Sequence, residues 1–196
     1  LMNLRTKMLL LFFFVPLLLM ISASLLYLWQ FDKMAGLLTD ESTKIVNQMA
    51  EDKIADLSTA VAIQCRLYLL AHPELNKADF MNDMGFKTLA VQKVGLTGYT
   101  ALYEMPDSDN IWRTWAHVNP KIIGIDMSQL KKPLGENFDG FWKVYTGVAD
   151  GKESRGYYQW RDSDGSLREK FMVCMPVPGT LYVIASTTYL DEFTQP

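Results

Sequence analysis

The sequence is poor in the residues from which most metal and catalytic sites are built. It has only two cysteines, Cys65 and Cys174, and two histidines, His72 and His117, among 196 residues. Metal sites need clustered thiolate, imidazole or carboxylate ligands, and ligands this few and this far apart predict none. The chain also lacks a nucleophile elbow, a phosphate-binding loop and a dinucleotide-binding fingerprint. We therefore predict a protein that is not an enzyme and that has no catalytic residues, no metal and no cofactor.

Positive charge is also in short supply. The formal net charge is -3, and no basic stripe indicates nucleic acid as a partner. The scarcity of cysteine leaves two possibilities for Cys65 and Cys174. An oxidising compartment would permit a disulfide between them, whereas two buried, reduced thiols are the alternative.

Charge of either sign is absent from one segment, the apolar run from Met8 to Leu28. A helix needs roughly 20 such residues to cross the hydrocarbon core of a bilayer. Arg5 and Lys7 precede the run, so the positive-inside rule predicts a cytoplasmic N-terminus and a domain outside the membrane after Trp29. We assign residues 1–30 to a cytoplasmic N-terminus and a single-pass signal anchor in the inner membrane, with a periplasmic domain behind it.

A cleaved signal peptide is the alternative to an anchor, because the small residues Ser22-Ala23-Ser24 resemble a cleavage region. Apolar residues continue to Leu28, which favours an uncleaved anchor. No second apolar run follows before Pro196. We therefore expect either that a partner transmits the signal or that the chain belongs to a longer protein with another span after Pro196.

Helix breakers are scarce after the anchor, since residues 31–71 contain no proline and one glycine, Gly36. Apolar residues recur at helical spacing, which predicts an amphipathic helix over residues 31–73 that continues from the membrane helix. The stripe consists of Phe31, Met34, Leu38, Ile45, Met49, Ile54, Leu57, Val61, Cys65 and Tyr68. His72-Pro73 ends the helix, because the residue before proline is disfavoured in the α region. The stripe departs from a heptad midway, so we expect the second half to pack on the chain's own sheet.

Residues 74–196 are typical of a small sheet domain. A helix is expected over Lys77–Val91, and after Gly95 short aromatic and β-branched runs alternate with turn clusters. The predicted strands are Tyr99–Glu104, Ile111–Val118, Gly156–Arg161, Leu167–Val177 and Leu181–Tyr189. Turns such as Asp162-Ser-Asp-Gly165 suit antiparallel hairpins. The fold class is therefore α+β, a transmembrane helix that continues into a long amphipathic helix packed on a five-stranded antiparallel sheet.

One long connection, from Asn119 to Arg155, joins the second and third predicted strands. A short helix is expected within it at Phe138–Tyr145. A connection this long in a small domain is usually functional, so we interpret it as a cover over the sheet.

Strand alternation sorts side chains onto two faces of the predicted sheet. One face gathers cations and aromatic rings, namely Arg113, Trp115, His117, Tyr158, Trp160 and Lys170. Aromatic walls with a few directed cations suit a pocket for a small anion or carboxylate. Solvated cations and aromatic sheet packing are the alternative, and for His117, beside Asn119-Pro120, so is a hydrogen-bonded turn residue. Tyr103 completes the candidate ligand-binding set.

The strand block resembles the signature of single Cache domains. Its main matches are Gly98-Tyr-Thr-Ala-Leu-Tyr-Glu104 and Trp115-Ala-His-Val-Asn-Pro-Lys-Ile-Ile-Gly124. Further matches are Gly156–Trp160, Arg168–Met172 and the closing segment Gly179–Phe193. The chain departs from the pattern at Ala116-His117-Val118-Asn119-Pro120, where Val118 splits the usual His-Pro pair.

Cache domains are the extracytoplasmic sensors of bacterial and archaeal chemoreceptors and sensor histidine kinases. The resemblance implies a PAS-like sheet whose face away from the long helix binds a small metabolite, such as a carboxylate or an amino acid. It also implies a homodimer through the membrane-proximal half of that helix. Lys170 falls where many single Cache domains place a lysine.

A pilin-like filament subunit is the structural alternative, because pilins also join an apolar N-terminal helix to a sheet head. Pilins usually carry a glutamate near the mature N-terminus, inside an otherwise apolar segment. This chain has no acidic residue before Asp32, which favours the sensor.

Overall fold

The computed structural model describes residues 3–162, 164–190 and 192. Ser163 in one predicted turn, and Asp191 and Phe193 in the closing motif, lie outside the described residues. The chain divides into two compact units, Leu1–Ile45 and Val46–Pro196, and each is described by itself.

The first unit consists of the N-terminal part of helix α1 (Leu4–Ala71), and its described side chains are all exposed. Pro16 lies inside the helix without ending it. This part includes a segment long and apolar enough to cross a membrane. Helical geometry suits that environment, because it satisfies backbone donors and acceptors within the segment.

The part of α1 in the second unit packs against a sheet. Its buried residues recur three or four positions apart and form one stripe, Ile54, Ala55, Ser58, Val61, Ala62 and Cys65. The helix ends at Ala71, directly before His72-Pro73. The predicted helix end and the predicted packing of this half are both confirmed.

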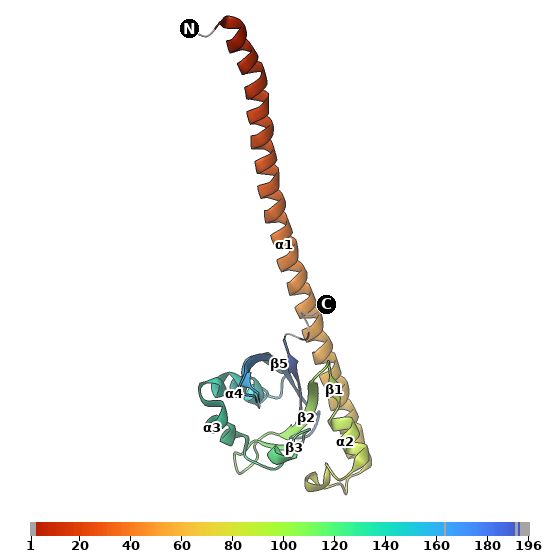
Figure 1. The fold of residues 1–196 in the computed structure, drawn as a ribbon. Coiled ribbons are helices and arrows are strands. Elements are labelled where there is room, and N and C mark those ends of the chain that lie inside the picture. The colour runs from red at the N-terminus through yellow and green to blue at the C-terminus, as the bar shows by residue number, and fades with distance from the viewer. Residues whose placement is uncertain (1–2, 163, 191, 193–196) are drawn as a thin grey trace. The chain divides into compact units, whose positions relative to one another are not determined.

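Six antiparallel strands form the sheet (Figure 1), in the order β1-β2-β6-β5-β4, with β3 also paired to β2. Their bounds are β1 Lys93–Val94, β2 Gly98–Glu104, β3 Arg113–Ala116, β4 Ser154–Arg161, β5 Leu167–Pro176 and β6 Tyr182–Tyr189. Five strands were predicted, and β1 is the additional one. It pairs only Lys93 with Tyr99 and Val94 with Gly98. A strand of two residues is too short to display the alternation on which strand prediction relies.

Strand β3 is shorter than predicted and contains a bulge. Leu102 of β2 pairs with Ala116, but the next residue, Tyr103, pairs with Thr114, so Trp115 is an extra residue on β3. A bulge of this kind shifts the alternation of side chains by one position. Trp115 and Ala116 consequently both pack with the core on the α1 side of the sheet.

The helix predicted over Lys77–Val91 is wrong as one element. The chain instead forms a short 3₁₀ helix, η1 (Lys77–Asp79), and then helix α2 (Met84–Ala90). Asp83 caps α2, since its carboxylate accepts a hydrogen bond from the Phe86 backbone N–H at 2.7 Å. The Tyr68 hydroxyl donates to the same carboxylate at 2.8 Å and ties the cap to α1. A residue that caps one helix cannot at the same time continue another, which explains the break.

The two faces of the sheet carry separate cores. Helices α1 and α2 cover one face, where Val61, Phe80, Phe86 and Ile184 are buried. The long connection covers the other face with helices α3 (Lys131–Leu134) and α4 (Phe138–Thr146) and three 3₁₀ helices (Figure 1). The predicted helix at Phe138–Tyr145 is confirmed, and so is the cover that it belongs to.

Both cysteines are buried and free. Cys65 packs in the core beneath α1, whereas Cys174 packs in the core beneath the cover, on the opposite face of the sheet. Burial raises the pKa of each thiol to about 12. Of the two predicted possibilities, the structure therefore has the pair of reduced thiols.

Candidate functional site

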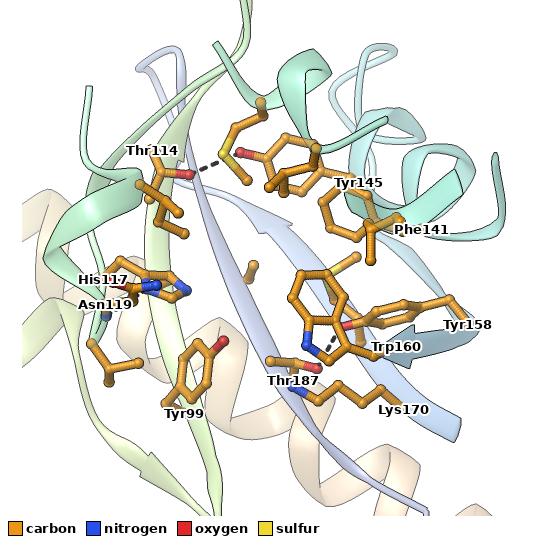
Figure 2. A pocket seen from close by; sticks show the side chains of 18 of the residues that line it. Tyr99, Thr114, His117, Asn119, Phe141, Tyr145, Tyr158, Trp160, Lys170 and Thr187 are labelled. Atoms are coloured by element: carbon orange, nitrogen blue, oxygen red, sulfur yellow. Dashed lines mark hydrogen bonds between the residues drawn. The ribbon is translucent and has the colours of Figure 1, made fainter. Parts of the chain in front are cut away.

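A cavity of about 540 Å³ lies between the sheet and the cover. Strands β2, β4, β5 and β6 contribute the side chains that face away from α1, and α3, α4 and neighbouring turns contribute the opposite wall. Most of the lining is apolar or aromatic. Ligand cavities are typically about 300–1,000 Å³, lined mainly by apolar groups with a few directed polar ones. Figure 2 shows the principal lining side chains.

Lys170 of β5 is the buried cation of this cavity, with 5% of its surface exposed. Its Nζ lies 4.4 Å from the centre of the Tyr189 ring, 5.1 Å from that of Trp160 and 5.7 Å from that of Tyr99. Within the described residues, no carboxylate forms an ion pair with it. Burial lowers the pKa of Lys170 to about 8, partly opposed by the charge of Asp162.

An ammonium in this position is stabilised by three aromatic faces but has no ion-pair partner among the described residues. Removing a charge from water is costly unless it is paired, so the group is poised to accept an anion.

His117 contributes a neutral hydrogen-bond donor to the same cavity. Its Nδ1 accepts a hydrogen bond from the Asn119 backbone N–H at 2.8 Å, which leaves the proton of the neutral ring on Nε2. Burial, together with the smaller effect of the charge of Lys170, lowers the pKa of His117 to about 4. His117 is therefore the hydrogen-bonded turn residue of the predicted alternative, and it also lines the cavity.

The polar groups that remain available converge on one region. The Tyr99 hydroxyl has no hydrogen-bond partner among the described residues, and its ring meets His117 edge to face at 4.8 Å. Burial raises the pKa of Tyr99 to about 12, so the hydroxyl remains a neutral donor. In Figure 2, Tyr99, His117 and Lys170 point toward the same part of the cavity.

The other hydroxyls of the lining are already partnered. Thr187 donates to the Phe171 carbonyl at 3.1 Å, so the Tyr158 hydroxyl, 2.9 Å away, donates to Thr187. The Tyr145 hydroxyl lies 3.2 Å from that of Thr114. These pairs orient the walls of the cavity and leave it with a single donor-rich end.

The structure brings five of the seven predicted site residues to the cavity. They are Tyr103, His117, Tyr158, Trp160 and Lys170. Arg113 and Trp115 lie elsewhere, because the bulge in β3 places His117 on the same side as Thr114 rather than on the side of Arg113 and Trp115. The sequence analysis assumed strict alternation over the whole segment and therefore placed His117 on the side of Arg113 and Trp115.

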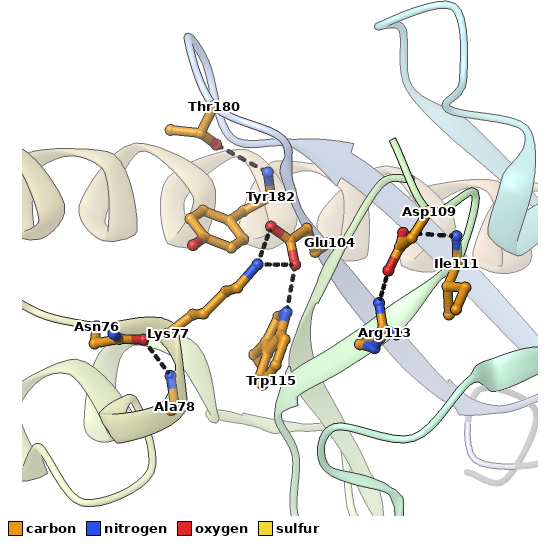
Figure 3. Close-up of polar contacts among 10 residues, drawn as sticks. All are labelled: Asn76, Lys77, Ala78, Glu104, Asp109, Ile111, Arg113, Trp115, Thr180 and Tyr182. Carbon is orange, nitrogen blue, oxygen red and sulfur yellow. Dashed lines mark hydrogen bonds and ion pairs between the residues drawn. The ribbon is translucent and has the colours of Figure 1, made fainter. Parts of the chain in front are cut away.

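Arg113 and Trp115 instead form polar contacts outside the cavity (Figure 3). Arg113 pairs with Asp109, and the Trp115 Nε1–H donates to Glu104 at 2.7 Å. Lys77 donates to both oxygens of Glu104 at 2.9 Å and lies 5.2 Å from the centre of the Trp115 ring. This cluster ties η1 to β2 and β3 and so serves the fold.

Several lining residues were missed by the sequence analysis. Alternation along β2 and β6 gave a signal for Tyr99, Thr187 and Tyr189, since each lies an even number of positions from another cavity residue of its strand. No comparable signal exists for Phe141 and Tyr145, which come from the cover. Their positions depend on how α4 packs on the sheet.

The comparisons with known proteins concern the fold. No protein-family model matches the chain. No curated protein matches it in sequence. Among solved structures, it is similar to a periplasmic sensor domain of a chemotaxis protein, with 19% identity, a TM-score of 0.53 and coverage of 72% of this chain and 95% of that one. It is also similar to a Cache chemosensory domain described for carboxylic acid recognition, with 18% identity, a TM-score of 0.48 and coverage of 77% and 92%.

The chain has the α+β fold of the periplasmic sensor domain of that chemotaxis protein. The predicted fold class and the predicted resemblance are confirmed at this level, with six strands in place of five. Along the chain this fold follows a helix that includes a segment long and apolar enough to cross a membrane.

The environment of His117 predicts a pH dependence of stability. The unfolded chain binds a proton at this residue near pH 6.5, whereas the folded chain does so only near pH 4. The unfolded state therefore binds more protons between these values, and the free energy of unfolding decreases as the pH falls from about 6.5 to about 4. A shift of this size corresponds to on the order of 2–3 kcal/mol.

The check is urea denaturation of wild type, His117→Gln and His72→Gln at several pH values across that window. The His117→Gln variant is expected to lose most of the slope, and the His72→Gln control is expected to keep it. Equal slopes in wild type and His117→Gln would contradict this assignment.

Proposed function

We propose that the chain is a membrane-anchored, extracytoplasmic ligand-sensing domain that binds a small carboxylate or amino acid for transmembrane signal transduction. The observation that carries the proposal is the buried ammonium of Lys170, which has no ion-pair partner among the described residues, in a mostly apolar cavity. The Tyr99 hydroxyl and the His117 Nε2–H add neutral donors at the same end. Three donors directed at one region suit a carboxylate, since hydrogen bonds to a charged group contribute about 1.5–3 kcal/mol each.

In this proposal the ligand-binding residues are Tyr99, Tyr103, His117, Tyr158, Trp160, Lys170 and Tyr189. Lys170 holds the anion, and the aromatic residues exclude water and fix the position of the ammonium. The domain binds and releases its ligand unchanged, without catalysis. Binding acts on signalling through a difference in affinity between two states of the domain, since only such a difference shifts their equilibrium.

The anchor in the proposal is the apolar N-terminal part of α1, with the sensor in the periplasm and a single span in the inner membrane. The same helix links the anchor to the face of the sheet opposite the cavity. It therefore offers a physical route between ligand and membrane.

We further propose that the chain forms a homodimer through the membrane-proximal part of α1. The apolar stripe there is exposed in the single chain and consists of Phe31, Met34, Leu38, Ile45 and Met49. Light scattering of the full chain in detergent is expected to give twice the protomer mass after subtraction of the detergent. A monomer mass throughout the micromolar range would exclude this interface.

Replacement of Lys170 tests the site directly. Lys170→Met keeps the length of the side chain and removes its charge, so the fold without ligand is expected to remain intact. Loss of a charged hydrogen bond of about 1.5–3 kcal/mol predicts at least a roughly 10- to 100-fold loss of affinity. The measurement is thermal stabilisation by a panel of carboxylates and amino acids.

The control is Lys152→Met, since the Lys152 side chain is 81% exposed and lies outside the cavity. It is expected to respond to the panel as wild type does. Equal stabilisation of Lys170→Met and wild type by the same compound would remove Lys170 from the site.

The affinity of a carboxylate for this site is expected to depend on pH. The pKa of Lys170 is about 8 in the free protein, so its positive charge is lost progressively above that value while the ligand stays ionised. Apparent affinity should therefore fall roughly tenfold per pH unit above pH 8. Isothermal titration calorimetry between pH 6.5 and 9.5 measures it, and affinity unchanged up to pH 9.5 would contradict the role of Lys170.

A further inference from the structure

We propose that the ligand of this cavity is a monocarboxylate with an uncharged, apolar body of about five or more carbons, rather than an α-amino acid or a dicarboxylate. The inference rests on the proposed function and narrows its ligand class. Three properties of the cavity support this inference. They are the existing contacts of its carboxylate, the positions of its cations and the apolar lining of its far wall.

The carboxylate of the cavity is already engaged. Among the described lining residues, Asp162 is the acidic one. It accepts a hydrogen bond from the Tyr189 hydroxyl and forms an ion pair with Arg168, with 3.6 Å between Nη1 and Oδ2. The ammonium of an α-amino acid would need a carboxylate of its own here, because an unpaired buried charge is costly. Asp162 would have to share its single negative charge between Arg168 and that ammonium, while its Oδ1 also accepts from the Tyr189 hydroxyl.

The cations of the cavity are placed for one carboxylate. Lys170 is buried, whereas Arg161, the other basic residue among the described lining, is exposed and donates to the Gly165 carbonyl at 3.2 Å. A second carboxylate pointing to the cover would meet no cation there. Among the described lining residues, Arg161 at the end of β4 is the cation that could pair with the second carboxylate of a dicarboxylate.

The far wall is apolar and belongs mostly to the cover. Its members are Ile122, Met127, Leu130, Leu134, Phe141 and Met172. The hydroxyls of Thr114 and Tyr145, which also line the cavity, form a hydrogen bond with each other. A body without polar groups can therefore bury there without leaving a donor or acceptor unpaired.

The size of the cavity sets the scale of the ligand. A volume of about 540 Å³ is in the range that encloses ligands much larger than acetate. Burial of each methylene group contributes about 0.8 kcal/mol, which is roughly a fourfold gain in affinity. A ligand that fills the apolar end therefore binds far more tightly than one that reaches only Lys170.

The test is calorimetric titration of the full chain in lipid nanodiscs, with empty nanodiscs to subtract partitioning into lipid. The probes are acetate, butanoate, hexanoate and octanoate, together with 2-aminohexanoate, adipate, hexan-1-ol and hexylamine. Affinity is expected to rise roughly fourfold per methylene from acetate to hexanoate. Hexanoate is expected to bind at least tenfold more tightly than 2-aminohexanoate, adipate or hexanol, and Lys170→Met to abolish its binding.

A pair of variants tests the apolar wall. Leu130→Ala, in the cover, is expected to weaken octanoate binding several-fold and to leave acetate binding unchanged. Leu67→Ala is the control, since Leu67 is 60% exposed on α1 and does not line the cavity. Leu67→Ala is expected to change neither octanoate binding nor acetate binding. Equal effects of Leu130→Ala on both acids would overturn the assignment of the tail to this wall.

The outcomes separate the inference from the proposed function. Lys170-dependent binding with a flat dependence on chain length, or tighter binding of 2-aminohexanoate or adipate than of hexanoate, would overturn the inference and leave the carboxylate or amino acid sensor standing. For adipate, Arg161→Gln would then identify the second contact. Binding of hexylamine but of no carboxylate would overturn both.

Discussion

The architecture depends on one constraint, that a single antiparallel sheet must bury both of its faces. Layered domains are stable because each apolar face is covered by another element. Here α1 and α2 cover one face tightly, and the cover formed by α3 and α4 closes the other while leaving a cavity beneath it. The cavity exists because the second layer is built from short helices and turns rather than from one long helix.

Strand β6 lies between β2 and β5 and belongs to both layers. Its residues alternate between the two cores, so that Ile184 packs toward α1 while Ala185 lines the cavity. If a ligand on one face shifts β6, the contacts between β6 and the core beneath α1 on the other face change as well. In the proposed function, β6 is the element that would connect the site to α1.

Lys170 shows how the site departs from the rules that govern the rest of the core. Elsewhere in the described domain most buried polar side chains have a partner, as Thr100 has in the Ala90 carbonyl at 2.8 Å. Lys170 has three aromatic rings beside its ammonium and, among the described residues, no ion-pair partner. Residues that break such rules are commonly functional, because a binding site keeps groups unsatisfied until the ligand arrives.

Much of the fold was predictable because it follows local rules. Pro73 ends α1, and alternation along β4 and β5 correctly placed Tyr158, Trp160 and Lys170 on the face away from the helix. The errors arise where the conformation of a residue depends on tertiary contacts rather than on the local sequence pattern. Asp83 breaks the predicted second helix by capping α2, and the extra residue Trp115 shifts the face of everything after it. Neither effect is visible in periodicity, since a cap or a bulge alters one position only.

The bulge at Trp115 makes the edge of the cavity adjustable by a change in length. The bulge keeps Thr114 and His117 on the same side although they are three positions apart, so removal of Trp115 would leave His117 facing the cavity. Insertion of one residue between Ala116 and His117 would instead turn His117 toward the α1 side. The other strands would keep their pairing, because β2 is the strand to which β3 pairs within the described residues. A single-codon insertion could thus remove a hydrogen-bond donor from the site, which gives related domains a short evolutionary route between ligand preferences.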